Sequence, residues 1–226
     1  MRQRFVETKT IQYYVNKVSK IMTNPEAKLY IPRPTLFVFC GLPGSLRPDF
    51  SAELREELVE GQVDTINGEE YRKEMTVDDQ KIPSDELREE LVENALFYLG
   101  TGASVVLEEV MFSNSSSRTK HLARVVRAKF EVVTVNVDCD ESVAYNRLAA
   151  LEDEGVYSGK DNAWRTNPLR SFDSSAKHLK LAKPNEPGVS AVINIDGEDL
   201  TAYSVVRACC QLEEAGVAYS GLRLVS

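Results

Sequence analysis

The chain has 226 residues, with 27 lysines and arginines against 35 aspartates and glutamates, and its formal net charge is −8. Hydrophobic residues make up 42% of it, which is typical of a globular protein with a sizeable core. The acidic balance argues against a protein that coats nucleic acid or lies on an anionic membrane. We therefore expect no bulk nucleic-acid binding. No apolar run has the length of a membrane span, so we also expect no membrane segment.

The N-terminal arm, residues 1–33, differs in charge from the rest of the chain. It holds seven basic and two acidic residues and carries +5, so the remaining chain carries −13. Its apolar residues recur at helical spacing and predict an amphipathic helix. They are Ile11, Tyr14, Val15, Val18 and Met22. We expect a protein partner or a second copy of the chain to dock on this helix. Packing against its own domain, or a mitochondrial transit peptide, is the alternative.

The cysteines and histidines show no metal-binding pattern. They are Cys40, Cys139, Cys209, Cys210, His121 and His178, and no two cysteines have the CxxC spacing. The adjacent pair Cys209 and Cys210 lies in an apolar helical stretch, where cysteine behaves as a small buried hydrophobe. We therefore expect no metal site, reduced thiols and a cytoplasmic location.

Apolar strands and amphipathic helices alternate along residues 34–226, which we assign to one domain. The predicted strands cover residues 35–40, 63–66, 104–107, 131–137 and 189–195. The predicted helices run from Asp49 or Ser51 to about Glu60, onward from Glu69, and over 84–100, 118–129, 141–152 and 200–215. The polar segment 153–188 is predicted to be a lid or long loop that contains one helix. This alternation indicates a three-layer α/β fold with a mostly parallel five-stranded sheet and helices on both faces.

The strongest chemical signal is the turn Gly41-Leu42-Pro43-Gly44-Ser45 between the first strand and the next helix. A phosphate-binding loop needs a buried strand, small residues that let backbone N–H groups point inward, and a helix N-terminus beyond them. The full pattern is GxxxxGK[ST], and residues 41–48 match its first half. The candidate phosphate-binding residues are Gly41, Leu42, Pro43, Gly44, Ser45 and Arg47.

The second half of the loop departs from that pattern at every position. Leu46 replaces a glycine that allows close approach to the phosphates. Arg47 keeps a positive charge where lysine reaches the phosphates, but its planar fork is larger. Pro48 replaces the serine or threonine that ligates magnesium, and it removes one N–H donor. A plain strand-to-helix turn is therefore the alternative interpretation of this segment.

Four landmarks, in order, make roughly residues 34–215 resemble the P-loop kinases of the group that includes polynucleotide 5′-kinases, zeta-toxin-like kinases and 6-phosphofructo-2-kinases. The first is the loop opening at 41–45. The second is Glu69-Glu70-Tyr71-Arg72, which resembles the Asp-x-x-Arg of that family. The resemblance implies that Glu69 is the general base and that Arg72 holds the substrate. It also implies ATP and magnesium as cofactors if the site is functional.

The third and fourth landmarks lie at the ends of later strands. The segment Val105-Val106-Leu107-Glu108-Glu109, with Phe112 and Arg118 beyond it, resembles the Walker-B-like strand end and its downstream arginine. Glu108 or Glu109 then stands for the acid of that strand. The segment Val135-Asn136-Val137-Asp138-Cys139, followed by Arg147, resembles the strand and helix that lead into the ATP lid. The resemblance implies that Arg147 faces the cleft.

Three features of the family pattern are altered in this sequence. Glu69 stands where the family has an aspartate, Pro48 offers no hydroxyl for magnesium, and Leu151 stands where related kinases carry a second lid arginine. Arg165 and Arg170 are candidates to replace that arginine. Phosphoryl transfer depends almost entirely on positioning and charge neutralisation.

These changes favour an eroded nucleotide site in a non-catalytic, pseudokinase-like protein that serves as a binding or scaffolding module. The alternative is an ATP-dependent phosphotransferase that acts on a nucleotide, a nucleic-acid 5′ end or the hydroxyl of a small metabolite. An active enzyme of that kind would need Arg47 in the role of the lysine. It would also need the acids Glu69, Glu108 and Glu109 to hold magnesium.

Overall fold

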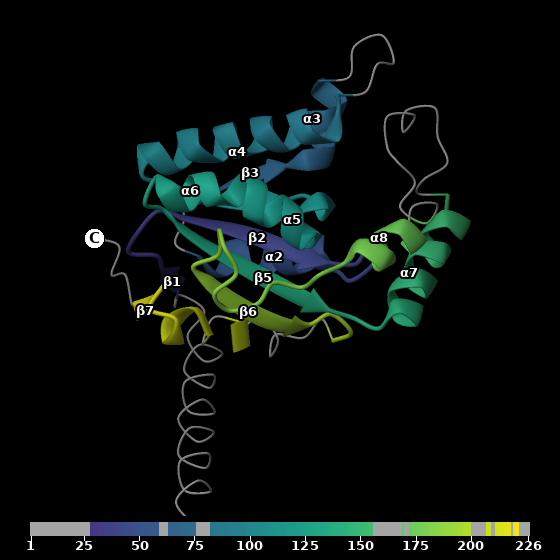
Figure 1. Cartoon of the computed structure of the whole chain (residues 1–226). Helices are drawn as coiled ribbons and strands as arrows, with labels where there is room; N and C mark the ends of the chain where they lie inside the picture. Colours follow the sequence, from purple (N-terminus) through teal and green to yellow (C-terminus); the bar gives the residue numbers. More distant parts are fainter. Residues whose placement is uncertain are drawn as a thin grey trace, which may run out of the picture.

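The computed structural model describes residues 28–58, 63–75, 82–155, 169, 172–199, 207–208, 211–217 and 219–221. The predicted N-terminal helix, Arg165 and Arg170 of the predicted lid, and most of the predicted helix 200–215 lie outside these residues. Figure 1 shows how the elements are arranged. Within the described part of the chain, no helix is long and apolar enough to cross a membrane.

Five parallel strands form the central sheet, in the order β3-β4-β2-β5-β6 (Figure 1). They are β2 Thr35–Gly41, β3 Val63–Asn67, β4 Ser104–Glu108, β5 Glu131–Asp138 and β6 Ala191–Asp196. In the middle strand β2, Leu36 pairs with Val105 of β4 and with Val132 of β5. All residues of β2 are buried, which explains its continuous apolar run. The predicted parallel five-stranded sheet is confirmed.

Helical segments connect the strands. They are α2 Arg47–Glu57, α3 Gly68–Glu74, α4 Ser84–Thr101, η1 Val110–Ser113, α5 Ser115–Ser117, η2 Arg118–Leu122, α6 Ala123–Arg127, α7 Glu141–Asp153 and α8 Phe172–His178. The η2 segment is a π-helical turn that lies between α5 and α6. Among the described residues of the segment predicted to be a lid, one helix, α8, is present.

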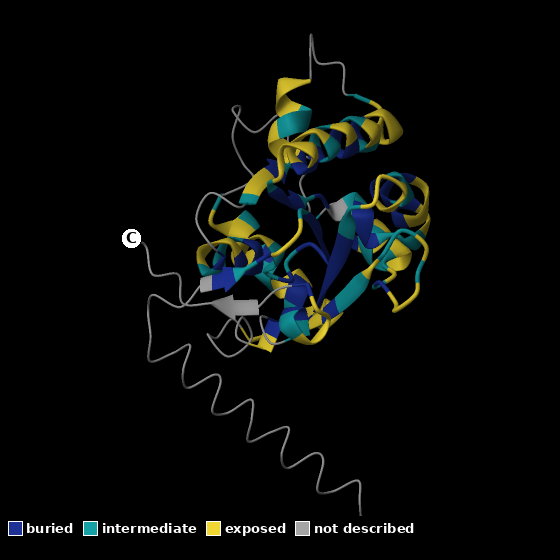
Figure 2. Ribbon diagram, turned by 90° about the vertical axis from the view of Figure 1, so that its left-hand side faces the viewer, coloured by how far each residue is buried: buried dark blue, intermediate teal, exposed yellow. Residues whose placement is uncertain are grey.

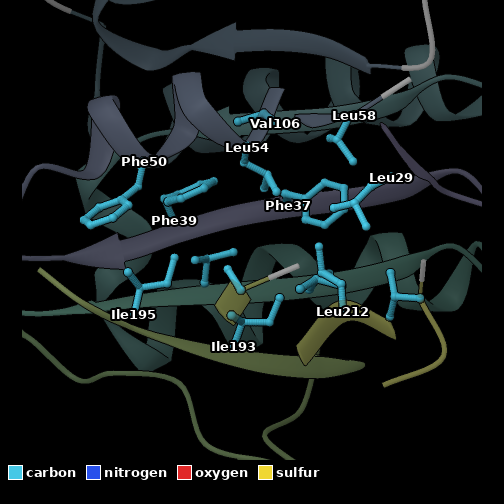
Figure 3. Close-up of a cluster of buried hydrophobic side chains, with 14 of the residues drawn as sticks. Leu29, Phe37, Phe39, Phe50, Leu54, Leu58, Val106, Ile193, Ile195 and Leu212 are labelled. Carbon is cyan, nitrogen blue, oxygen red and sulfur yellow. The ribbon is translucent and has the colours of Figure 1, made fainter. Parts of the chain in front are cut away.

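Alternate residues of β2 face opposite sides of the sheet and build two separate cores. Phe37 and Phe39 pack on the side of α2, where Phe50 lies over the sheet (Figure 3). Leu36 and Val38 pack on the other side, against apolar residues of α4, η2 and α6. Figure 2 shows buried residues on the sheet and exposed residues on the outer faces of the helices. The predicted three-layer arrangement is therefore confirmed.

The helix α2 begins earlier than predicted. Neither Asp49 nor Ser51 is its N-cap, because the helix begins at Arg47, directly after Leu46. The reason is Pro48, since proline lacks an N–H that the first helical turn leaves unpaired anyway, and its fixed φ suits that turn. Ser51 lies inside the helix and is completely buried, so its hydroxyl is available for a contact within the site.

A short antiparallel strand pair was not predicted. It consists of β1 (Lys28–Tyr30) and β7 (Tyr219–Gly221), and three residues are too few for a periodic signal. Leu29 and Ile31 are buried in the same hydrophobic cluster as Phe37. The end of the segment assigned to the N-terminal arm therefore packs into the domain.

His121 of η2 is a buried histidine. Its ring lies edge-on to Phe112 with 6.4 Å between ring centroids, and its Nε2 is 3.7 Å from Oδ1 of Asp85. Burial lowers the pKa of His121, and the positive charges of Lys120 and Arg88 lower it further, against the opposing effect of Asp85. The folded protein thus favours the neutral imidazole.

We expect the free energy of unfolding to fall as the pH decreases from about 7.5 to about 5.5. His121 has a lower pKa in the folded protein than in the unfolded chain, where it is about 6.5, so the unfolded state binds the proton first. Its contribution is present above about pH 6.5 and is lost as the pH falls below that value. Urea titrations across this range measure the effect. His121→Gln should flatten the pH dependence, whereas the same change at exposed His178 should not. An unchanged slope in His121→Gln would contradict the assignment.

Candidate functional site

The loop from Gly41 to Leu46 joins β2 to α2 at the carboxyl end of the central strand. In open parallel α/β sheets, ligands bind outside the carboxyl ends of the strands. The end of β4, at Glu108, and the start of α3 lie at the same edge, because β3 and β4 run parallel to β2. The first three landmarks of the sequence therefore meet at one place.

Both glycines of the loop are required by backbone packing. Gly44 has φ +83°, and a Cβ there would lie 2.3 Å from the carbonyl oxygen of Ala144 in α7. A Cβ on Gly41 would lie 2.6 Å from the carbonyl oxygen of Val137. The hydroxyl of Ser113 accepts from the Gly41 N–H and donates to the Gly41 carbonyl, both at 3.0 Å. These contacts within the protein set the path of the loop.

Leu46 has the left-handed backbone that glycine readily adopts. Its φ is +62° and its ψ is 23°, a conformation that costs a non-glycine residue about 1–2 kcal/mol. The side chain is partly buried against the hydrophobic cluster of Phe37. On the other side of the loop, Leu42 packs against Ala144 and Leu148 of α7. The two leucines anchor the loop to the domain. The backbone at Leu46 is left-handed although the phosphate-loop pattern has a glycine at this position.

Two polar atoms of the loop have no hydrogen-bond partner among the described residues. They are Oγ of Ser45 and Nε of Arg47, and Ser45 is completely buried. The missing Cβ of Gly41 would lie 2.7 Å from Ser45 Oγ and 3.2 Å from Arg47 Cδ. The Arg47 side chain therefore folds back over the start of the loop. The N-terminus of α2 has no side-chain cap, so its first N–H groups also lack a side-chain acceptor.

Burial lowers the pKa of Arg47, and nearby negative charges act against that shift. The carboxylates involved are Glu109, Glu69 and Glu108. Within the described residues, the guanidinium forms no ion pair. Since arginine remains protonated in proteins, Arg47 supplies a positive charge at the mouth of the loop.

The two carboxylates at the end of β4 are bound to protein partners. Glu108 accepts a hydrogen bond from the hydroxyl of Ser51, and its Oε2 lies 3.4 Å from Nδ2 of Asn67. Glu109 is 3% exposed, and its Oε2 lies 3.1 Å from a guanidinium nitrogen of Arg72. The second oxygen of Glu109 accepts from a backbone N–H in η1 at 3.1 Å.

Gly68 allows the ion pair of Arg72 and Glu109 to form. A Cβ at this position would lie 2.2 Å from Oε2 of Glu109. The next residue, Glu69, is exposed in the first turn of α3, and its backbone N–H donates to Oδ1 of Asn67 at 2.9 Å. The structure thus brings Arg72 and Glu109 together, and places the predicted base Glu69 at the surface.

The Arg147 side chain binds three backbone carbonyl groups. Its guanidinium donates to the carbonyl oxygens of Gly197 at 2.6 Å, Glu198 at 3.0 Å and Gly44 at 3.4 Å. It therefore ties the loop to α7 and to the turn after β6. An arginine with three carbonyl acceptors has few donors left for a phosphate.

A pocket of about 510 Å³ lies beside these Arg147 contacts, at the carboxyl ends of β5 and β6. It is lined by Asp138, Cys139, Asp140, Asn194, Ile195, Asp196, Glu198 and Arg207. Four carboxylates against one guanidinium make the lining negative, which disfavours a polyphosphate in this pocket.

Arg118, the predicted downstream arginine, is completely buried away from solvent. It forms a two-point ion pair with Glu186, with Nε and one terminal nitrogen each 2.9 Å from a carboxylate oxygen. It also donates to the carbonyl oxygens of Phe112 at 2.8 Å and Lys180 at 2.7 Å. This residue joins η1 to the segment that follows α8.

Sequence reasoning missed three residues that shape the site: Ser51, Asn67 and Ser113. Asn67 had a readable signal, since asparagine before Gly-Glu-Glu is a favourable N-cap, and its side chain does cap α3. Ser51 and Ser113 had none, because their partners lie 57 and 72 residues away in the sequence.

The residues of the site fit a phosphate group better than they fit magnesium. An orphaned hydroxyl, an arginine without an ion pair and an uncapped helix N-terminus suit an anion. Magnesium needs hydroxyl, carboxylate or water oxygens in octahedral geometry. Pro48 provides no hydroxyl, and Glu108 and Glu109 already bind Ser51 and Arg72.

The sheet order, the loop after the central strand and the helices on both faces define a P-loop kinase-like fold. The sequence matches no model of a known protein family, and a search of curated proteins finds no match either. The structure is similar to Chaetomium thermophilum Kti12 in complex with ADP-AlF3, at TM-score 0.61 and 14% identity over 80% of this chain and 98% of Kti12.

Two kinases show the same likeness. The APS kinase of Mycobacterium tuberculosis, solved with AMPPNP and APS, has TM-score 0.53 and 16% identity over 81% of this chain and 98% of its own. A gluconokinase from Sinorhizobium meliloti has TM-score 0.51 and 16% identity over 80% and 93%. At these identities the likeness shows the fold, and the predicted P-loop kinase fold is confirmed.

Proposed function

We propose that this kinase-fold protein has a nucleotide site that does not support phosphoryl transfer, and that it serves as a binding or scaffolding module in the cytoplasm. The observation that carries this proposal is the pairing of both carboxylates at the end of β4. Glu108 accepts from Ser51, and Glu109 is paired with Arg72. A phosphotransferase needs such acids to hold a metal, and Pro48 removes the hydroxyl that would help.

The position of Arg147 supports the same proposal. The guanidinium of Arg147 already donates hydrogen bonds to three backbone carbonyl oxygens. The basic arm of residues 1–33 is the segment that we propose for contact with a protein partner or a second copy.

The second candidate is an ATP-dependent phosphotransferase acting on a nucleotide, a nucleic-acid 5′ end or a small-metabolite hydroxyl. Two observations favour it: the loop keeps a left-handed backbone at Leu46 at an energetic cost, and the Arg47 side chain folds over the loop. ATP and magnesium would then be the cofactors. Arg72 would have to leave Glu109 before either could act in catalysis.

Phosphoryl transfer from ATP distinguishes the two functions. We expect no turnover of γ-labelled ATP with magnesium, either to water or to a panel of nucleosides, oligonucleotide 5′ ends and sugars. Turnover that disappears in Arg47→Ala would contradict the proposed function. The triple change Leu46→Gly, Arg47→Lys, Pro48→Ser rebuilds the full loop pattern and should gain magnesium-dependent ATP binding. Replacing Pro48 by alanine, which frees the N–H but supplies no hydroxyl, is the matched control.

A further inference from the structure

We propose that the loop of residues 41–47 binds a phosphate group without a divalent cation, and that the guanidinium of Arg47 supplies the positive charge in its place. The inference deepens the proposed function, on which it rests, because a site that does not organise magnesium must balance phosphate charge by other means. Three independent features of the loop carry it.

The first feature is a buried hydroxyl without a partner. Ser45 is completely buried, and its Oγ has no hydrogen-bond partner among the described residues. It lies inside the loop, 2.7 Å from the point that a Cβ of Gly41 would occupy. Buried polar groups in native proteins are almost always paired, so an orphaned one calls for a ligand or a water molecule. A phosphate oxygen can accept its hydrogen.

The second feature is the backbone at the start of α2. Leu46 holds a left-handed conformation, and no side chain caps this helix of 11 residues. A left-handed residue before a helix turns successive N–H groups toward one point, which forms a concavity that attracts anions. The helix dipole adds positive potential at the same end. The strained backbone conformation of Leu46 therefore gives the loop a shape that suits an anion.

The third feature is the Arg47 side chain itself. Its Cδ lies 3.2 Å from the position of the missing Gly41 Cβ, and its Nε is buried and unpartnered within the described residues. The carboxylates of Glu108 and Glu109, which would be its natural partners, are bound to Ser51 and Arg72. A planar guanidinium can bind a phosphate by two parallel hydrogen bonds, which an ammonium cannot do.

The changes at Arg47 and Pro48 from the magnesium-binding loop pattern are both consistent with this proposal. Pro48 supplies no metal ligand, and Glu108 and Glu109 each already bind a protein partner, Ser51 and Arg72 respectively. Arg47 brings a fixed charge to the phosphate directly. Magnesium should therefore give no gain in affinity, and should weaken binding slightly where it competes for the phosphate oxygens.

The phosphate could come from free phosphate or pyrophosphate, or from a nucleotide, and the test separates these sources. Pyrophosphate and ATP are each titrated into the full chain by isothermal titration calorimetry, once with EDTA and once with excess magnesium. We expect binding in EDTA that magnesium does not strengthen. Equal affinities for the two probes assign the site to the phosphate alone, and tighter binding of ATP assigns it to a nucleotide. Both results support the proposal.

Variants identify the residue responsible. Arg47→Ala should weaken binding in EDTA by about tenfold or more, as expected for loss of a two-point charged contact, and Arg47→Lys should restore part of it. Arg55→Ala, at an exposed arginine of the same helix, should bind like the parent chain. Circular dichroism checks that each variant is folded, and the partial rescue by lysine excludes a merely structural effect.

Three results would overturn the proposal: binding that appears only with magnesium, binding in EDTA that is unchanged in Arg47→Ala, or no binding of either probe. These outcomes differ from the failure of the proposed function, which is detected as transfer of the γ-phosphate. A chain that transfers phosphate with magnesium but binds none in EDTA would refute both, whereas a chain that does neither would refute only this inference.

Discussion

Replacing Arg118 by methionine is expected to lower the free energy of unfolding by about 3–5 kcal/mol. The guanidinium is completely buried and forms a two-point ion pair with Glu186, whose side chain is only 9% exposed. Methionine would leave that carboxylate buried without its positively charged partner. It would also remove the hydrogen bonds that arginine donates to the carbonyls of Phe112 and Lys180, at 2.8 and 2.7 Å. Urea denaturation followed by circular dichroism measures the change.

Arg124 is the matched control for this experiment. Its ion pair with Glu93 joins two side chains that are 38% and 54% exposed, so Arg124→Met should cost less than about 1 kcal/mol. A double variant, with methionine at both Arg118 and Glu186, should be more stable than Arg118→Met, because no buried charge is then left unpaired. Equal losses at the two arginines would refute a structural role for Arg118.

Replacing Gly44 by alanine is expected to lower the free energy of unfolding by about 2–4 kcal/mol. Two costs add at this residue. The backbone has φ +83°, where an L side chain is strained, and the new Cβ would lie 2.3 Å from the backbone oxygen of Ala144. Backbone cannot rotate away as a flexible side chain can, so the loop must separate from α7.

Gly102 allows the two costs to be separated. It has φ +97° at the end of α4, and a Cβ there would meet no atom within 4 Å. Gly102→Ala should therefore show the conformational cost alone, about 1–2 kcal/mol. Urea titrations of both variants give the comparison. If Gly44→Ala is no less stable than Gly102→Ala, the close contact with Ala144 does not contribute to the loss of unfolding free energy.

The packing of Gly41 and Gly44 changes the meaning of the loop motif. Each glycine is required by a close backbone contact, with Val137 and Ala144 respectively. A match to the first half of the phosphate-loop pattern therefore follows from the fold alone. Evidence for a ligand comes from Ser45 and Arg47, whose polar atoms the described fold leaves unsatisfied.

Cys40 is an inert residue beneath this loop. Burial raises the pKa of its thiol to about 11, against the opposing charges of Arg118 and Arg47. The thiol donates to the carbonyl of Phe112 at 3.2 Å. Because the thiolate is the reactive form, this cysteine should not take part in redox chemistry near neutral pH.

The start of α2 and the pair β1–β7 show where local patterns were insufficient. Asp49 and Ser51 are good capping residues by type, but Pro48 and the left-handed Leu46 begin the helix at Arg47. The β1–β7 pair depends on two segments about 190 residues apart that meet only in the folded chain. A capping preference is worth about 1 kcal/mol, which tertiary packing readily overrides.

The alternation of buried strands and amphipathic helices could be predicted from the amino-acid sequence, and with it the parallel sheet and the position of the loop after its central strand. These features are local, because a strand buried on both faces must be a continuous apolar run. The partners of the charged residues could not be predicted in this way, and the folded structure pairs Arg118 with Glu186 and Arg72 with Glu109. A side chain's role depends on which groups share its low-dielectric surroundings, and residues distant in sequence supply those groups. The same reason left Arg47 without an ion pair in the described structure, and made it the residue on which the site depends.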